Sequence, residues 1–304
     1  MRKRLSVLIV MSLTAIMLLT GCGSSGSPKD TTTPETTKAP EVEVTTEAET
    51  TADATTEDET METFKVGLEA GYAPFNWTQM DDSNAGVKID GNAEYAGGYD
   101  VEIAKKLAEG LGMKLVIVKT EWDGLVPALM SDKIDAIIAG MSPTEDRKVT
   151  IDFTDNYYKS DLVMVVKNGG NYEGATSIKD FNGAKITAQL NTFHYSVIEQ
   201  IEGVEIQPAM DNFPAMRVAL QSGIIDGYVS ERPEGISASS ANENFAFVDF
   251  TDGFVTSDDD TAIAVGIAKD SELTDKINEI LAGISEEERT SIMDAAILNQ
   301  PAAQ

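Results

Sequence analysis

One short segment of the chain combines residue types that can bind a small carboxylate. Gly140 follows an apolar run, and Ser142 and Arg147 follow Gly140 at short spacing. A glycine permits close backbone approach, a hydroxyl adds a hydrogen bond, and a planar guanidinium offers two parallel donors to a carboxylate. We therefore predict that Arg147 binds a carboxylate, with Ser142 and the backbone at Gly140 completing the site. The alternative for Arg147 is a surface ion pair with Asp146 or Asp152.

The pattern of apolar residues predicts strands that alternate with helices. The expected strands are Thr63–Leu68, Lys114–Val118, Ile134–Ala139, Leu162–Val166, Lys185–Ala188, Val204–Ile206, Ile225–Val229 and Ala262–Ala268. The expected helices are Tyr99–Leu111, Gly124–Met130, His194–Ile201, Phe213–Gln221, Ser271–Ile284 and Glu286–Leu298. Such alternation predicts a mostly parallel sheet covered on both faces. Because Asp132–Ala136 and Ser222–Gly227 are related phrases that each follow a helix, we expect two similar α/β lobes.

The beginning of the chain predicts an export signal and a linker. Residues 2–4 are basic, residues 5–19 are mostly apolar, and Leu-Thr-Gly-Cys ends the run at Cys22. This pattern indicates that residues 1–21 are a signal peptide, and the tetrapeptide resembles the bacterial lipobox, in which the cysteine is lipidated. The alternative is a chance cysteine at the end of a plain signal peptide. Residues 22–62, rich in Thr and Glu, are predicted to be a disordered linker.

Charge and composition narrow the classes of function. The formal net charge of −28 disfavours nucleic acid and anionic lipid headgroups as partners. Cys22 is the only cysteine, so the sequence has no intrachain disulfide. The sequence also has no phosphate-binding Gly-x-x-x-x-Gly-Lys-Ser/Thr segment and no set of spanning helices. Any transport energy must therefore come from partner proteins.

Four motifs, taken in order, resemble those of bacterial extracellular solute-binding proteins, family 3, the polar amino-acid-binding group of ABC importers. They are Glu69–Phe75, Gly98–Ala104, Trp122–Leu129 and Gly140–Arg147, and the resemblance extends from Thr63 to about Leu298. The resemblance implies the two-lobed type II periplasmic-binding-protein fold, an α/β fold whose lobes close over a ligand by a hinge. The expected division is 63–160 for the first part of lobe 1, 161–256 for lobe 2 and 257–304 for the return to lobe 1.

The resemblance also implies which residues bind the two charged ends of an amino acid. Arg147 matches the arginine that grips the α-carboxylate, and the segment from Gly140 through Met141 to Ser142 completes the cradle. Glu231 stands where the family usually has an aspartate that binds the α-ammonium, and it is one methylene longer. Thr192 corresponds to a residue of lobe 2 that adds a hydroxyl and a backbone donor at the start of a helix. Phe193, which follows it, is bulkier than the residue usual in the family.

At the side-chain end, the resemblance implies a polar and aromatic environment. Tyr72 and Trp122 match aromatic positions that sandwich the ligand side chain, although ordinary core packing is the alternative for both rings. Glu69 matches an acidic position that contacts a polar or cationic terminus, and Gln189 is expected to line the same end. This set suits lysine, arginine, histidine or ornithine. Related binders keep an acid there for neutral glutamine, so the implied preference for a basic ligand is modest.

Two further features have no clear counterpart in the family. Trp77–Tyr95 is longer than the usual turn, and its oxygen-rich residues lack the spacing of a known calcium loop, so we expect a surface insertion that roofs the cleft. His194 is the only histidine, which excludes a multi-histidine metal site, and no nucleophile is evident beside it. We expect it to be a polar residue near the cleft rim, and we expect no metal or other cofactor.

The predicted protein is a monomeric lipoprotein on the outer face of the cell membrane. It would capture a polar L-amino acid, with a modest preference for a basic one, and present it to an ABC permease and its ATPase. An enzyme of the same fold, of the cyclohexadienyl dehydratase type, is one alternative, with Glu231 or Glu69 as its acid or base. A sensor or adhesin that is not coupled to transport is another.

Overall fold

The computed structural model describes residues 61–301. The predicted signal peptide, the predicted lipidation site Cys22 and nearly all of the predicted linker lie outside the described residues. Within residues 61–301, no helix is both long and apolar enough to cross a membrane.

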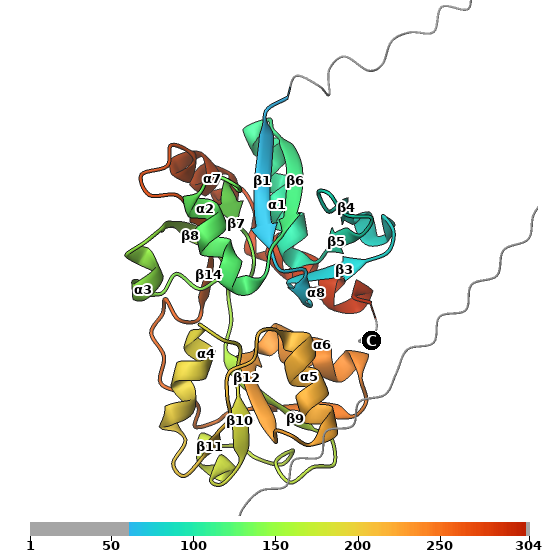
Figure 1. Cartoon of the computed structure of the whole chain (residues 1–304), viewed down its shortest axis with the longest axis vertical. Helices are drawn as coiled ribbons and strands as arrows, with labels where there is room; N and C mark the ends of the chain where they lie inside the picture. Colours follow the sequence, from blue (N-terminus) through green and yellow to red (C-terminus); the bar gives the residue numbers. More distant parts are fainter. Residues whose placement is uncertain (1–60, 302–304) are drawn as a thin grey trace, which may run out of the picture. The chain divides into compact units, whose positions relative to one another are not determined.

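The first of two five-stranded sheets has the strand order β6-β1-β7-β14-β8 (Figure 1). Its strands are β1 (Thr63–Leu68), β6 (Lys114–Lys119), β7 (Ala136–Ile137), β8 (Asp152–Lys159) and β14 (Ala262–Ile267). The β1 strand pairs in parallel with β6 and β7, whereas β14 is antiparallel to β7 and β8. The helices on this sheet are α1 (Tyr99–Leu111), α2 (Leu125–Met130), α3 (Glu145–Lys148), α7 (Leu273–Ala282) and α8 (Glu286–Asn299). We call this sheet and its helices lobe one.

The second sheet has the order β11-β10-β12-β9-β13, and with its helices it forms what we call lobe two. Its strands are β9 (Leu162–Lys167), β10 (Lys185–Thr187), β11 (Glu205–Ile206), β12 (Gly227–Glu231) and β13 (Phe245–Asp249). Its helices are α4 (Phe193–Ser196), α5 (Phe213–Ser222) and α6 (Arg232–Ala241). As in lobe one, parallel pairs lie on one side of the sheet and antiparallel pairs on the other. The mixed sheets flanked by helices confirm the predicted α/β class.

The predicted insertion Trp77–Tyr95 is not a plain surface loop. It supplies most of a four-stranded antiparallel sheet with the order β2-β3-β5-β4. The strands are β2 (Gly71–Tyr72), β3 (Asn76–Gln79), β4 (Val87–Lys88) and β5 (Tyr95–Gly97). Strands this short give little periodic signal, and their pairing to one another, which the sequence pattern does not reveal, defines the element.

The chain passes from lobe one to lobe two after β8 and returns before β14. Ser160 and Asp161 form the first crossing, and residues 250–261 form the second. The two crossings are bonded to each other, because the Ser160 N–H donates to the Thr261 carbonyl at 2.9 Å. At the lobe-two end, the Arg232 N–H donates to the Asp161 carbonyl at 2.9 Å. Two adjacent crossings of this kind permit rotation of one lobe against the other.

The predicted boundaries of helices and strands agree with the structure best where apolar and polar residues recur with a regular period. The predictions for Thr63–Leu68 and Tyr99–Leu111 are confirmed to the residue. The predicted strand Ile134–Ala139 is buried but only its two-residue centre, β7, joins the sheet, because the rest turns into the Gly140 segment. The predicted strand Ile225–Val229 begins two residues later, at Gly227. Strands β8 and β13 and helix α6 were not predicted.

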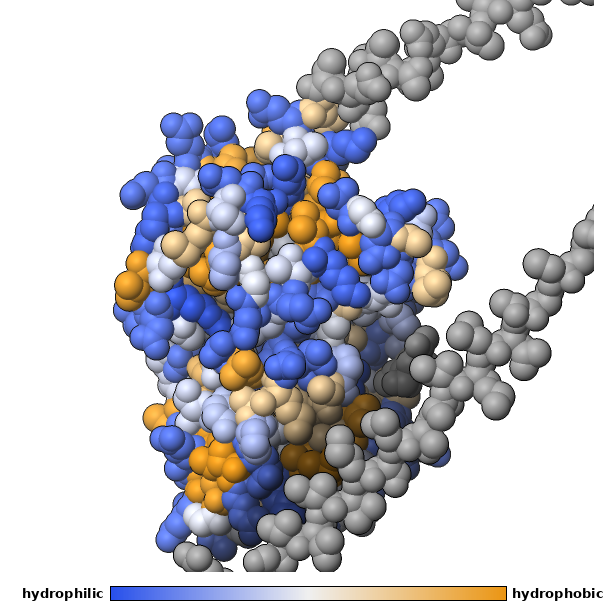
Figure 2. Space-filling view, in the orientation of Figure 1, coloured by the Kyte–Doolittle hydropathy of each residue, from blue (hydrophilic) through white to orange (hydrophobic). Residues whose placement is uncertain are grey.

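The apolar residues that fix the lobes lie inside, and charged residues cover the outside. The interior strand β14 is buried along its whole length, and β1 is buried at Val66, Gly67 and Leu68. Hydrophilic residues predominate over the lobe-one part of the face drawn in Figure 2. Burial of both faces of an interior strand explains why the β14 segment reads as a continuous apolar run.

Candidate ligand-binding site

Arg147 lies on α3 with its guanidinium turned toward lobe two. Its Nη1 donates to the Ser142 carbonyl at 2.9 Å, and its Nη2 donates to the Asn191 carbonyl of lobe two at 3.0 Å. The guanidinium carbon lies 5.1 Å from the centre of the Trp122 ring, a cation–π contact. Burial lowers the pKa of Arg147 to about 10. A desolvated guanidinium held only by carbonyls is suited to an incoming carboxylate.

The alternative of a surface ion pair for Arg147 is wrong. Among the described residues, no carboxylate lies within ion-pair distance of its guanidinium, and Asp152 pairs instead with Lys269 at 2.6 Å. Arg147 therefore has no carboxylate within ion-pair distance among residues 61–301.

Gly140 is held by a buried hydrogen-bond network of lobe one. Its N–H donates to the Tyr157 hydroxyl at 3.2 Å, and that hydroxyl donates to Asp100 Oδ1 at 2.7 Å. Asn76 donates to the other Asp100 oxygen at 2.8 Å, while burial raises the pKa of Asp100 to about 6. Gly140 has a left-handed φ of +63°, and a Cβ there would lie 2.7 Å from the Tyr72 ring. Only glycine satisfies both the backbone angle and the contact.

The two other residues of the predicted cradle lie differently. The Ser142 side chain is buried, and its Oγ donates to the Asp260 carbonyl at 2.9 Å, while its own carbonyl accepts from Arg147. The Met141 side chain packs in the core and does not line the cleft. Its carbonyl accepts from the Ala264 N–H at 3.1 Å, which ties the segment to strand β14.

Glu231 ends β12 in lobe two and reaches lobe one. The Tyr72 hydroxyl donates to its Oε2, a contact between residues 159 positions apart in the sequence. The carboxyl group is buried, and burial raises its pKa to about 8. The extra methylene that distinguishes glutamate from aspartate therefore carries the carboxyl group across the cleft to a lobe-one hydroxyl.

Gln189 connects Thr192 to Glu69. The Thr192 hydroxyl donates to the Gln189 carbonyl at 2.7 Å, and Gln189 Nε2 donates to Glu69 Oε2 at 2.9 Å. Glu69 Oε1 is buried without a hydrogen-bond partner, and burial raises the pKa of Glu69 to about 7. The two residues expected at the side-chain end of a ligand thus contact each other, from opposite lobes.

The aromatic residues are arranged differently from the predicted sandwich. Tyr72 stacks on Phe213 of lobe two, with ring centres 4.1 Å apart and planes 10° apart, whereas Trp122 faces Arg147. Phe213 was not predicted. The sequence feature that could have identified Phe213 is the preceding residue, Asn212. The Asn212 side chain caps α5 by accepting from the Ala215 N–H at 3.0 Å. A capping residue followed by an aromatic one marks a helix start, but it does not show where the ring points.

His194 is buried inside the cleft and is not at its rim, so that prediction is wrong. Its ring lies 4.3 Å from the ring of Phe193, and its Nε2 lies 3.0 Å from Glu231 Oε1. Burial, with a further contribution from the Arg147 charge, lowers the pKa of His194 to about 3. The imidazole is therefore neutral at physiological pH.

These residues enclose a narrow space between the lobes. It is lined by Tyr72, Trp122, Gly140, Ser142, Arg147, Gln189, Thr192, Phe193, His194 and Phe213. The cavity is about 10 Å³, which is close to the space of one water molecule. Because side chains of the two lobes bond directly across it, an amino acid can enter only if the lobes move apart.

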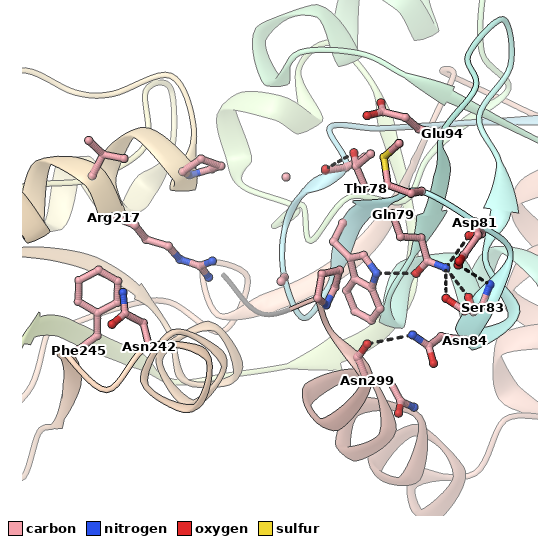
Figure 3. A pocket seen from close by; sticks show the side chains of 18 of the residues that line it. Thr78, Gln79, Asp81, Ser83, Asn84, Glu94, Arg217, Asn242, Phe245 and Asn299 are labelled. Carbon is pink, nitrogen blue, oxygen red and sulfur yellow. Dashed lines mark hydrogen bonds between the residues drawn. The ribbon is translucent and has the colours of Figure 1, made fainter. Parts of the chain in front are cut away.

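A second groove lies outside this site, between the four-stranded sheet, α5 and the end of α8 (Figure 3). Its volume is about 550 Å³. Gln79 accepts from Trp77 Nε1 at 2.8 Å, and Asn84 donates to the Asn299 carbonyl at 3.1 Å. Arg217 enters from α5 but pairs with Glu234 at 2.8 Å. Because the predicted insertion lines this groove and not the cleft at Arg147, it does not roof the predicted site.

Among residues 61–301, no group of three or more His, Cys, Asp and Glu side chains could hold a metal ion. The acidic residues of the Trp77–Tyr95 segment instead make local bonds. Asp81 accepts from the Ser83 N–H at 3.1 Å, and Glu94 accepts from Asn92 at 3.3 Å.

Comparison with known proteins agrees with the fold. Residues 64–296 match the profile of the bacterial extracellular solute-binding proteins, family 3. The chain belongs to this family. The chain is 33% identical over 207 residues to a probable histidine-binding protein of Campylobacter jejuni, covering 64% of this chain and 74% of that protein. It is 30% identical to an arginine-binding extracellular protein of Bacillus subtilis, over 71% of this chain and 78% of that one.

The solved structures place the chain among type II periplasmic-binding proteins. An amino-acid ABC transporter substrate-binding protein from Streptococcus pneumoniae, bound to L-arginine, superposes with a TM-score of 0.69 at 25% identity. The match covers 78% of this chain and 94% of that protein. An ancestral arginine-binding protein bound to arginine superposes with a TM-score of 0.62 at 30% identity, over 76% and 96% of the two chains. These matches confirm the predicted fold.

Proposed function

We propose that this family member is the extracellular receptor of an amino-acid ABC importer. It captures a polar L-amino acid, with a modest preference for a basic one, and is tethered by a lipid at Cys22. The observation that carries the proposal is Arg147, a desolvated guanidinium with no carboxylate partner among the described residues. Arg147 of lobe one and the buried carboxyl group of Glu231 of lobe two both lie near His194, the first acting on it through its charge and the second at 3.0 Å. The carboxylate of a zwitterionic amino acid would bind Arg147, and its ammonium group would bind Glu231.

The proposed ligand replaces contacts that now join the lobes. Its α-carboxylate takes the place of the Asn191 carbonyl at Arg147, and its α-ammonium takes the place of the Tyr72 hydroxyl at Glu231. Because the ligand then contacts both lobes, its binding free energy favours the closed arrangement. That closed form is what a permease and its ATPase would recognise, and the receptor acts as a monomer.

Two observations support a basic side chain. Glu69 has one buried oxygen without a hydrogen-bond partner, and Gln189 lies beside it. The relatives named above carry the names of histidine- and arginine-binding proteins, while an Escherichia coli relative, 32% identical over 56% of this chain and 59% of its own length, is named an L-cystine-binding protein. The class of polar amino acids therefore has broader support than the basic subclass.

A thermal-shift screen with the twenty common L-amino acids tests the proposal. We expect one or more polar amino acids to raise the melting temperature, because a ligand that binds only the folded state stabilises it. Arg147→Ala should abolish the increase, because it removes the charged partner of the ligand carboxylate, an interaction that contributes about 2 to 5 kcal/mol.

Arg289 provides the matched control. Its guanidinium also donates to backbone carbonyls, at Asn156, Ile284 and Leu281, but it lies outside the cleft. Arg289→Ala should lower the melting temperature of the free protein and leave the increase caused by the ligand intact. An unchanged increase in Arg147→Ala would refute the assignment of the carboxylate end.

An enzyme of the same fold is the competing function, because a buried carboxyl group with a raised pKa, such as Glu231, is what a general acid requires. The relatives are named as binding proteins, which supports capture without turnover. Incubation of the purified protein with prephenate or arogenate should leave both unchanged. If the purified protein converts either compound and Glu231→Gln abolishes that activity, the protein is an enzyme and not a receptor.

A further inference from the structure

His194 is a buried polar side chain without hydrogen bonds. It is 6% exposed, and neither ring nitrogen has a hydrogen-bond partner among the described residues. Buried polar atoms in folded proteins almost always have a partner, because an unpaired one keeps its full desolvation penalty. Since His194 lines the cleft, the missing partner can come from whatever the cleft holds.

The neighbours of His194 restrict the kind of partner. Its Nε2 lies 3.0 Å from Glu231 Oε1, but the two atoms are not aligned for a hydrogen bond. Burial and the nearby Arg147 charge lower the pKa of the ring, so the imidazole is neutral and has one donor and one acceptor nitrogen. A ligand carboxylate beside Nε2 would be repelled by an ionised Glu231, whereas a donor group could bond to both residues.

We propose that His194 binds the ligand, with Nε2 accepting one N–H of the α-ammonium beside Glu231. This inference rests on the proposed function, and it adds a second lobe-two residue to the recognition of the amine. The accepting Nε2 requires the proton of the neutral ring to reside on Nδ1. Since a primary ammonium has three donors, it can serve Nε2 and the Glu231 carboxylate together.

Recognition by two acceptors has a consequence for specificity. An α-hydroxy acid has one donor where the amino acid has three, so it cannot donate to Glu231 and to His194 at the same time, and it lacks the charge of the ammonium. The cleft should therefore discriminate more strongly between an amino acid and its α-hydroxy analogue than a site with Glu231 alone. A merely structural role for His194 would not affect this ratio.

Nitrogen-15 NMR of the histidine ring tests the proposal directly. Because His194 is the only histidine in the chain, its two ring-nitrogen signals are unambiguous. The probe is the amino acid that gives the largest increase in melting temperature among the twenty common L-amino acids. At saturation we expect the Nδ1–H tautomer and a shift of the Nε2 signal toward that of a hydrogen-bond acceptor. Unchanged signals, or an Nε2–H tautomer, would overturn the proposal.

Substitutions measure the effect on affinity. His194→Phe keeps a ring against Phe193 and deletes the acceptor, so it should weaken binding of that amino acid roughly tenfold or more. His194→Gln, which places an amide oxygen near Nε2, should restore part of the affinity. Tyr195→Phe is the matched control on the same helix, because the Tyr195 hydroxyl donates to the Gln207 carbonyl at 3.0 Å, outside the cleft lining. Tyr195→Phe should leave the affinity for the amino acid unchanged.

The decisive measurement is calorimetric affinity for the amino acid and for its α-hydroxy analogue. We expect His194→Phe to lower the ratio of the two affinities and Tyr195→Phe to preserve it. An unchanged ratio in His194→Phe would refute the contact, and the NMR experiment on the unmodified protein applies even if that variant fails to fold. If none of the twenty amino acids binds, the proposed function and this inference fail together. If one binds and the ring signals do not move, only this inference fails.

Discussion

The two ends of the cleft are built in different ways. At the carboxylate end, Gly140 and Arg147 are positioned mostly by lobe one itself, through Tyr157, Asp100 and the Ser142 carbonyl. This end is bonded to lobe two through the Asn191 carbonyl. A site held by its own lobe is in place before the lobes close, so its ordering is already achieved when a ligand arrives.

The ammonium and side-chain end depends on both lobes. Glu231 of lobe two bonds to Tyr72 of lobe one, and Gln189 of lobe two bonds to Glu69 of lobe one. His194 has no hydrogen-bond partner among the described residues. If the proposed function holds, we expect a ligand to bind first to the carboxylate end, which lobe one holds in place, and closure of the lobes then to assemble the rest of the site.

Gly140→Ala should disrupt the carboxylate end, with an effect second only to that of Arg147→Ala. A Cβ at the left-handed φ of +63° is strained by about 1 to 2 kcal/mol, and it would also lie 2.7 Å from the Tyr72 ring. The added Cβ should displace the Tyr72 ring, which lines the cleft and bonds to Glu231. We expect ligand binding to weaken roughly tenfold or more, which corresponds to about 1.4 kcal/mol or more. Calorimetry with the amino acid found in the thermal screen measures the affinity.

Gly112→Ala separates strain from contact. Gly112 has a similar φ of +67°, but a Cβ there would meet nothing within 4 Å. It should lower the melting temperature, though less than Gly140→Ala does because it adds strain without a clash, and leave the affinity unchanged. Equal losses of affinity in the two variants would show that the carboxylate end is not organised by the contact between Gly140 and Tyr72.

Glu69→Gln sharpens the view of the side-chain end. A hydrogen bond to a charged group is about 1 kcal/mol stronger than one between neutral groups, so arginine should lose about fivefold more affinity than glutamine. Glu121→Gln is the control, because Glu121 is exposed and acts on Glu69 only through its charge. Equal losses for arginine and glutamine in Glu69→Gln would contradict the preference for a basic ligand.

The end assembled by closure should also respond to pH, with a smaller effect. Burial raises the pKa of Glu231 to about 8 and of Glu69 to about 7, from about 4.5 for an exposed glutamate. A raised pKa means that the closed arrangement holds these protons more tightly than an open one. The contribution of Glu231 and Glu69 to the stability of the closed arrangement is therefore complete below about pH 4.5, and it is lost as the pH rises toward 8.

Small-angle X-ray scattering of the ligand-free protein measures this response. We expect a larger radius of gyration at pH 8.5 than at pH 5, because the lobes separate as the carboxyl groups ionise. Glu231→Gln should reduce the difference, since it leaves only Glu69 to titrate. Identical radii at the two pH values in the unmodified protein would show that the carboxyl groups do not control closure.

Local patterns were sufficient for much of the fold. The alternation in Thr63–Leu68 and the helical spacing in Tyr99–Leu111 depend on neighbours within a few positions, and both elements are confirmed. The run Ile134–Ala139 was less informative, because it is buried except at the half-buried Asp135 yet contributes only two residues to the sheet. A buried run has no period from which its hydrogen bonds can be read.

The amino-acid sequence by itself determined which residue types stand at the strand ends, and with them the guanidinium of Arg147 and the glycine at position 140. Tertiary structure alone decided that Tyr72 bonds to Glu231, that Glu69 bonds to Gln189, and that His194 and Phe213 point into the cleft. The physical reason is sequence separation. Side chains 159 and 120 positions apart meet only when two separately folded sheets are brought together, and no local periodicity encodes that meeting.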